Sequence, residues 1–128
     1  MARITALYAG VLAILIVVLA SRVVRVRQTT AIGLGDGSNE VLLRRIRIHG
    51  NAVENIPIGL LVMLTLEING ASAILLHGLG LSLTLGRLAH AQGLSGSPGA
   101  SAGRVAGTTL SWLSIVVGAV AAIVSYAR

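Results

Sequence analysis

Four long apolar runs separated by short polar stretches dominate this chain. The first run covers residues 4–20, and the polar stretch RVVRVRQTTAIGLGDGSNE follows it at 22–40. A membrane span needs about 20 mostly apolar residues, so this run is near the minimum length. Glycine and polar residues at 33–39 predict a loop, and Ser38 or Asn39 would cap the helix that follows. The pattern predicts four transmembrane helices, with spans at about 4–22, 41–69, 73–92 and 102–126.

The first apolar run has an alternative interpretation as a signal peptide. Arg3 precedes it, and the sequence LAS at its end resembles a weak cleavage site. Cleavage at this point would leave only three of the four spans. We therefore expect the segment to be retained as a helix.

Composition supports a membrane protein rather than a soluble domain. Of the 128 residues, 55% are hydrophobic and only 11% are charged, whereas soluble domains carry roughly 25% charged residues. The chain has no cysteine, which excludes disulfides and a cysteine nucleophile. We expect an all-α membrane protein in which residues 1–128 form a single four-transmembrane-helix bundle.

All ten basic residues are arginines, and the net charge is +6. A nucleic-acid-binding protein would need a basic face on a soluble fold, usually with aromatic side chains for stacking. Here the arginines lie at the ends of apolar segments, so we expect no nucleic-acid partner.

The distribution of the arginines predicts the orientation of the chain. Four spans place the first and third loops on one side of the membrane, and eight arginines flank these loops: Arg22, Arg25, Arg27, Arg44, Arg45, Arg47, Arg87 and Arg104. The other side has Arg3 and Arg128. Because basic residues favour the cytoplasmic side, we expect an inner-membrane protein with cytoplasmic long loops and both termini outside.

The stretch LRRIRIHGNAVENIP, residues 43–57, places polar side chains in the second apolar segment. Arg44, Arg47, Asn51 and Glu54 are spaced by three and four residues, which puts them on one helix face. Such groups either join helices through a structural polar network or mark a functional site.

Polar residues follow helical spacing in the last two segments as well. Arg87 and His90 are one turn apart in the third, and Arg104 opens the fourth. A free helix N-terminus together with a guanidinium favours a bound anion. The histidines lack a local metal-ligand spacing such as HExxH, so we expect no metal site. The small residues Gly107 and Ser111 predict close packing of the fourth helix.

These patterns together predict a basic pocket between helices at the inner leaflet. Its arginines would be Arg25 or Arg27, Arg44, Arg47, Arg87 and Arg104. Arginine suits bidentate recognition of a carboxylate or a phosphate. Lipid headgroups would satisfy such a pocket as well as a soluble metabolite would.

The stretch RIRIHGNAVENIP, followed by Glu67 and HGLGLSLTLGRLAHAQGL, resembles the MAPEG family, the membrane-associated proteins in eicosanoid and glutathione metabolism. The family's second helix reads roughly E-R-x-x-R-A-H-x-N-x-x-E, and its third contains G-R-x-x-H. The matching positions are Arg44, Arg47, His49, Asn51 and Glu54, then Gly86, Arg87 and His90. These sequence stretches are most similar to the bacterial branch of the family.

The resemblance implies a homotrimer of four-helix subunits that binds glutathione between neighbouring subunits. Arg47, Asn51 and Glu54 would then hold its peptide and amino groups. Its carboxylates or thiol would meet Arg25, Arg87, His90 and Arg104. The chain departs from many members at four positions: Leu43 in place of a glutamate, Gly50 in place of a basic residue, and Leu94 and Thr108 in place of tyrosines.

A glutathione transferase or peroxidase-like enzyme acting on lipophilic electrophiles is therefore the expected function. Arg104 is the expected catalytic residue, because a nearby cation favours the thiolate. The alternative is a non-catalytic membrane trimer that binds lipid headgroups or another anion. Proton passage through His49, Glu54 and His90 is less favoured, since these groups cluster at one face of the membrane.

Overall fold

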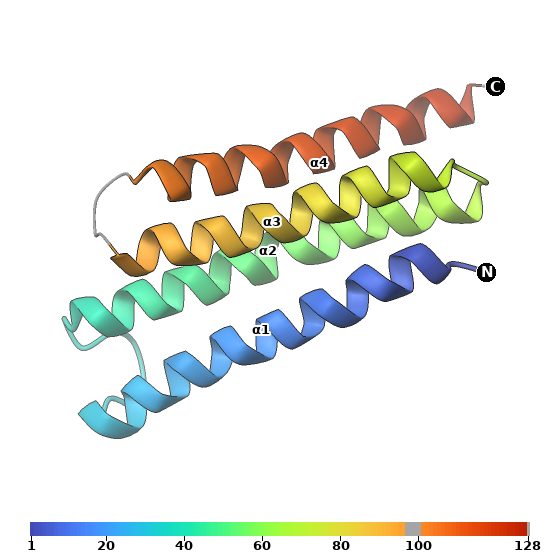
Figure 1. Cartoon of the computed structure of the whole chain (residues 1–128). Coiled ribbons are helices and arrows are strands. Elements are labelled where there is room, and N and C mark those ends of the chain that lie inside the picture. The colour runs from blue at the N-terminus through green and yellow to red at the C-terminus, as the bar shows by residue number, and fades with distance from the viewer. Residues whose placement is uncertain (97–100, 128) are drawn as a thin grey trace.

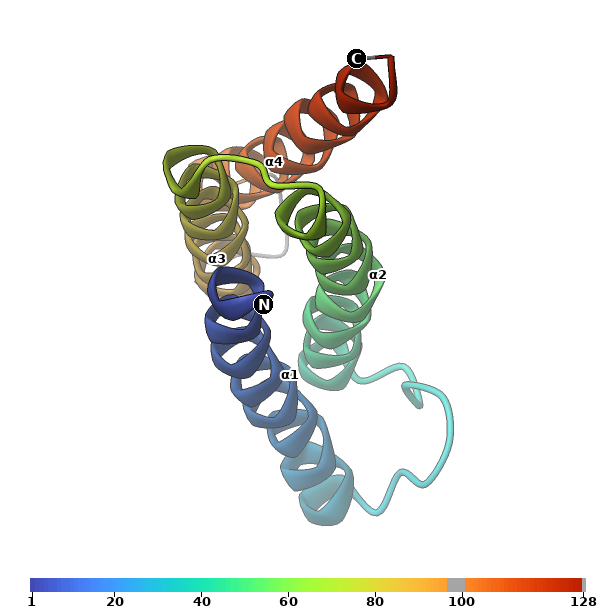
Figure 2. The same cartoon turned by 90° about the vertical axis from the view of Figure 1, so that its right-hand side faces the viewer.

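The computed structural model describes residues 1–96 and 101–127, and within them it contains four α-helices and no strand. The helices are α1 (Arg3–Thr30), α2 (Glu40–Ile68), α3 (Ala73–Gly96) and α4 (Ala102–Tyr126). They run alongside one another as an antiparallel bundle (Figure 1). Helices α2 and α3 each contact all the others, whereas α1 and α4 lie on opposite sides of this pair (Figure 2). The predicted four-helix fold is confirmed.

Two helices extend beyond their predicted spans. Helix α1 continues to Thr30 and so includes Arg25 and Arg27, which lie beyond the predicted span, and α3 continues to Gly96. At the end of α1, the Arg27 Nη1 donates to the carbonyls of Ile32 (3.1 Å) and Gly35 (3.0 Å), which fixes the start of the loop. Residues 93–96, which follow the predicted third span, are therefore helical; residues 97–100 and Arg128 lie outside the described residues.

Polar side chains satisfy the backbone groups that helix ends leave without partners. Asn39 caps α2 as predicted, since its Oδ1 accepts from the backbone N–H of Leu42 at 3.0 Å. The carboxylate of Glu67, near the end of α2, accepts from the backbone N–H groups of Ile4 (2.8 Å) and Thr5 (2.7 Å). This contact joins the end of α2 to the start of α1.

The bundle is apolar both inside and outside. Leu12, Ile56 and Leu83 are almost completely buried between the helices, while Val17 and Val116 are among many aliphatic side chains exposed on the outside. Exposed apolar surface on this scale is typical of a surface that lies in lipid. Among the described residues, α1, α2 and α4 are each long and apolar enough to cross a membrane.

The two ends of the bundle differ in character. The α1–α2 connection, the end of α3 and the start of α4 lie at one end, which we call the loop end (Figure 1). The N-terminus, the α2–α3 turn and the end of α4 lie at the other (Figure 1). Arg22, Arg44 and Arg104 belong to the loop end and Arg3 to the opposite end, so the positive charge is concentrated as the sequence predicts.

Candidate functional site

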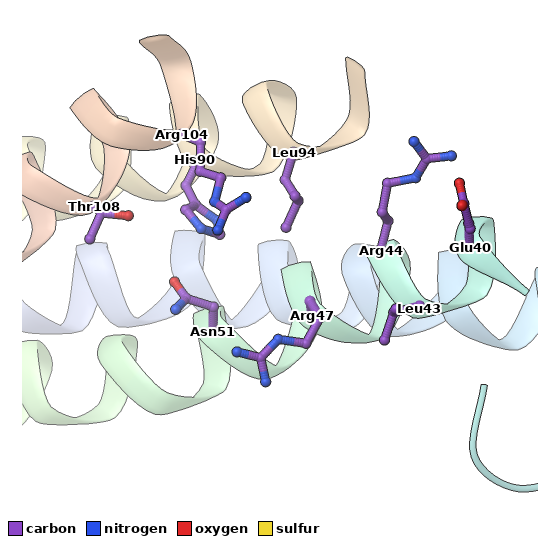
Figure 3. A pocket seen from close by; sticks show the side chains of 9 residues that line it. All are labelled: Glu40, Leu43, Arg44, Arg47, Asn51, His90, Leu94, Arg104 and Thr108. Carbon is purple, nitrogen blue, oxygen red and sulfur yellow. The ribbon is translucent and has the colours of Figure 1, made fainter. Parts of the chain in front are cut away.

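A cavity of about 400 Å³ opens at the loop end between α2, α3 and α4. Figure 3 shows Arg104 of α4 and His90 of α3 side by side, facing Asn51 of α2. The lining side chains are mostly polar or charged and come from three helices: Glu40, Leu43, Arg44, Arg47, Asn51, His90, Leu94, Arg104 and Thr108. We call this cavity the anion pocket, because arginines are its main charged groups.

The helical spacing of the α2 residues explains their shared position. Arg44, Arg47 and Asn51 line the pocket together, which confirms that they occupy one helix face. Glu40 lies one turn before Arg44 and extends this face to the first turn of α2. The sequence analysis did not group Glu40 with these residues, although its spacing of four residues from Arg44 would have placed it with them.

Two exposed residues predicted for the site lie outside the pocket within a single chain. Glu54 continues the polar face of α2 but is exposed and does not line the cavity. Arg25 is exposed on α1, which lies across the α2–α3 pair from α4. A single chain therefore does not bring either residue to the pocket.

Arg87 lies beneath the pocket and does not line it. Its side chain is only 2% exposed, and it donates to groups on two other helices. The Nε donates to Ser111 Oγ at 2.7 Å, and the Nη2 donates to the Gly107 carbonyl at 3.1 Å. The Nη1 donates to the side-chain oxygen of Asn51 and to its carbonyl, the latter at 3.4 Å. Arg87 thus joins α2, α3 and α4 and fixes the orientation of Asn51 in the pocket wall.

Close approach of α3 and α4 makes the Arg87 contacts possible. A Cβ added to Gly86 would lie 2.5 Å from Ser111 Oγ and 2.9 Å from the Gly107 carbonyl oxygen. These distances are too short for a real side chain, so α4 can reach this position only beside a glycine. The hydroxyl of Ser111 also donates to the Gly107 carbonyl at 2.9 Å. The sequence identified Ser111 as a packing residue and did not identify it as a partner of Arg87.

The first turn of α4 supplies the remaining wall. Ser101 caps this helix: its Oγ accepts from the Arg104 backbone N–H at 3.3 Å and donates to the Gly93 carbonyl at 2.9 Å. This pair of bonds fixes the start of α4 against α3. The guanidinium of Arg104 lines the pocket and favours an anion, and Thr108 lines it one turn further on.

The charges in the anion pocket favour a ligand with more than one acidic group. Among its described lining residues, Arg44, Arg47 and Arg104 are cationic and Glu40 is acidic. Guanidinium groups bind carboxylates and phosphates through paired hydrogen bonds, and Glu40 could pair with an ammonium group. Among the described residues, no group of three or more histidine or acidic side chains is arranged to hold a metal ion.

Comparison with known proteins identifies the family. The MAPEG family matches residues 5–124 of the chain. The inner membrane protein YecN of Escherichia coli strain K12 is 44% identical over 90 residues, which cover 70% of this chain and 69% of that protein. The protein of the same name from E. coli O6:H1 strain CFT073 is equally similar over the same lengths. No solved structure matches the chain. The protein described here, a bundle of four helices with both helix motifs in place, belongs to the MAPEG family of membrane proteins.

Proposed function

We propose that the protein is an inner-membrane glutathione-binding enzyme that transfers glutathione to lipophilic electrophiles or reduces lipophilic peroxides with it. The anion pocket carries this proposal, because its arginines surround a cavity of about 400 Å³ at the polar end of a MAPEG bundle. Glutathione has two carboxylates, one amino group and one thiol. Arg44 and Arg47 suit the carboxylates, and Glu40 suits the amino group.

Arg104 is the proposed catalytic residue. It stands in the first turn of α4, where the helix N-terminus and the guanidinium both stabilise a thiolate. The thiolate sulfur would attack an electrophilic carbon and form a carbon–sulfur bond, and a leaving group would depart with the bonding electrons. The electrophile would enter from the bilayer, toward the aliphatic side chains Leu43 and Leu94 of the pocket wall.

A homotrimer would complete this site. Arg25 and Glu54 belong to the set that resembles the family's ligand residues, yet both are exposed and outside the pocket of a single chain. A neighbouring subunit would bring them to the bound glutathione. Native mass spectrometry in mild detergent should then give a three-subunit species, and a purely monomeric protein would contradict the shared site.

The anion pocket also supports a second candidate function, a non-catalytic trimer that binds lipid headgroups or another anion. Leu94 and Thr108 line the pocket at positions where many family members have tyrosines, so no phenol is available there to orient a thiol. Arginine-lined pockets between helices bind lipid phosphates through the same hydrogen bonds. Activity with glutathione separates the two functions.

The test is a calorimetric titration of glutathione into the detergent-purified protein. The wild type should bind saturably, and Arg47→Ala should lower the affinity roughly tenfold to a hundredfold, since a charge-assisted hydrogen bond contributes about 1.5–3 kcal/mol. Arg45→Ala is the matched control, because Arg45 is on the same turn of α2 but does not line the anion pocket. If millimolar glutathione does not bind the wild type, the glutathione proposal fails and the second function is favoured.

A further inference from the structure

A second arginine-lined cavity lies on the other side of α2. It has a volume of about 600 Å³ and lies between α1, α2 and α3. Its described lining residues are Leu15, Val18, Leu19, Arg22, Arg45, Leu88, Ala91 and Gln92, none of which lines the anion pocket. Arg44 and Arg45 are neighbours in sequence, and the helical turn directs them to different cavities.

Polar and apolar side chains are separated along this second cavity. On α1, Leu15, Val18 and Arg22 follow one another by three and four residues, so Arg22 lies one turn nearer the loop end than the aliphatic residues. On α3, Gln92 likewise lies one turn beyond Leu88 toward the loop end. The cavity therefore has a polar mouth at the loop end and an aliphatic wall that runs toward the middle of the bundle.

We propose that this cavity binds an anionic phospholipid. The lipid phosphate would accept hydrogen bonds from Arg22 and Arg45, and one acyl chain would lie along Leu15, Val18 and Leu88. Among the described lining residues two are cationic and none is acidic, which suits a phosphodiester. Basic pockets between transmembrane helices at the membrane surface bind such headgroups.

The contrast with the anion pocket favours a lipid over glutathione here. The second cavity has no described acidic residue to pair with an ammonium group, and most of its wall is aliphatic. Glutathione has no alkyl chain to cover that wall, whereas a phospholipid does. The first run of apolar residues in α1 ends just before Arg22, at the depth where a headgroup phosphate would lie.

The bound lipid would hold the loop-end half of α1 against the bundle. At the opposite end, α1 is held by Glu67, which accepts from Ile4 and Thr5, and by Tyr8, whose Oη lies 3.0 Å from His77 Nδ1. Through Arg22 on α1 and Arg45 on α2, the phosphate would add a polar link at the loop end. Lipid binding should therefore raise the thermal stability of the protein.

The test adds phosphatidylglycerol or phosphatidylcholine to the delipidated detergent-solubilised protein and measures bound lipid by native mass spectrometry and the melting temperature. We expect at least a tenfold preference for phosphatidylglycerol and a higher melting temperature with it. Arg22→Gln with Arg45→Gln should remove the preference, and Arg22→Gln alone, a change at an exposed side chain, should reduce it several-fold. Arg44→Gln, which removes the same charge from the neighbouring position, should retain it.

Three outcomes of the lipid measurements would overturn the proposal. These are equal binding of the two lipids to the wild type, an unchanged preference in the double variant, and an equal loss in Arg44→Gln. A parallel arm adds inorganic phosphate at the same concentration to the wild type and to the double variant, and it should change their melting temperatures equally, because phosphate bound in the anion pocket would stabilise both. Stabilisation by phosphate that equals that by phosphatidylglycerol and disappears in the double variant would assign the cavity to a soluble anion instead of a lipid.

Discussion

Arg87 contacts Asn51 and Arg47 lies one turn before Asn51 on α2, but the protein holds the two arginines in opposite ways. Arg87 is almost fully buried, and each of its guanidinium nitrogens donates to another helix. Arg47 is exposed and borders the anion pocket, and we propose that it binds the ligand there. An arginine in a membrane helix can thus hold the fold together or bind a ligand, and the placement of its donors distinguishes the two roles.

The largest expected effect follows from removing Arg87. Replacement by alanine leaves Asn51 without its partner and opens a cavity between three helices, so we expect a loss of roughly 3–5 kcal/mol in the free energy of unfolding. Denaturant-induced unfolding in detergent measures this loss. Arg87→Lys should recover only part of the lost stability, because lysine lacks the planar guanidinium whose nitrogens donate to three residues at once. Wild-type stability in Arg87→Ala would contradict the structural role.

A smaller effect is expected at Arg104, which lines the anion pocket as Arg47 does. Arg104→Gln should slow glutathione conjugation roughly tenfold to a hundredfold, a loss of about 1.5–3 kcal/mol of thiolate stabilisation, with stability changed much less. Steady-state rates with a lipophilic electrophile measure it. Unchanged conjugation together with unchanged binding would remove Arg104 from the proposed mechanism.

A change at Gly86 tests the packing that brings Arg87 to its acceptors. Gly86→Ala places a methyl group against Ser111 and Gly107, so we expect about 1–3 kcal/mol of destabilisation. Gly78→Ala on the same helix is the matched control, since nothing lies within 4 Å of an added Cβ there. The control should be neutral or slightly stabilising. Equal stability of both variants would show that the α3–α4 approach does not require a glycine.

The smallest effect is expected for Arg47→Lys, which keeps a positive charge at the edge of the anion pocket. Glutathione affinity should fall only about threefold to tenfold, because one point charge replaces a paired contact. The melting temperature without ligand should equal that of the wild type. Comparison with Arg87→Lys sharpens the contrast, and a larger loss of stability at Arg47 than at Arg87 would reverse it.

The sequence predicted the fold well because apolar runs of this length have few alternatives to membrane helices. It misplaced the end of α1 because Arg22, Arg25 and Arg27 end the apolar run without ending the helix. Arginine is a good helix former, so a helix can continue past the membrane. Only the left-handed residue Ala31, with a φ of 55°, marks its end.

The site was predicted in part. Spacing along one helix is enough to group Arg44, Arg47 and Asn51, because a helix face is a local property. Whether Arg87 lines the pocket or lies beneath it depends on how closely α3 approaches α4, which is a tertiary property. The single-chain structure places Arg25 and Glu54 outside the pocket, and their predicted contact with a ligand depends on a second subunit.

Thermal unfolding of the wild type, Arg47→Ala and Arg87→Ala, each with and without glutathione, tests the central contrast most directly. A ligand that binds only the folded state raises stability by RT ln(1 + [L]/Kd). We predict a glutathione-dependent rise for the wild type, and for Arg47→Ala the wild-type melting temperature with little or no rise. We predict a lower melting temperature for Arg87→Ala even without ligand. Loss of the glutathione effect in Arg87→Ala with its melting temperature unchanged would contradict the account, because Arg87 would then act as a ligand contact and not as the support of the pocket.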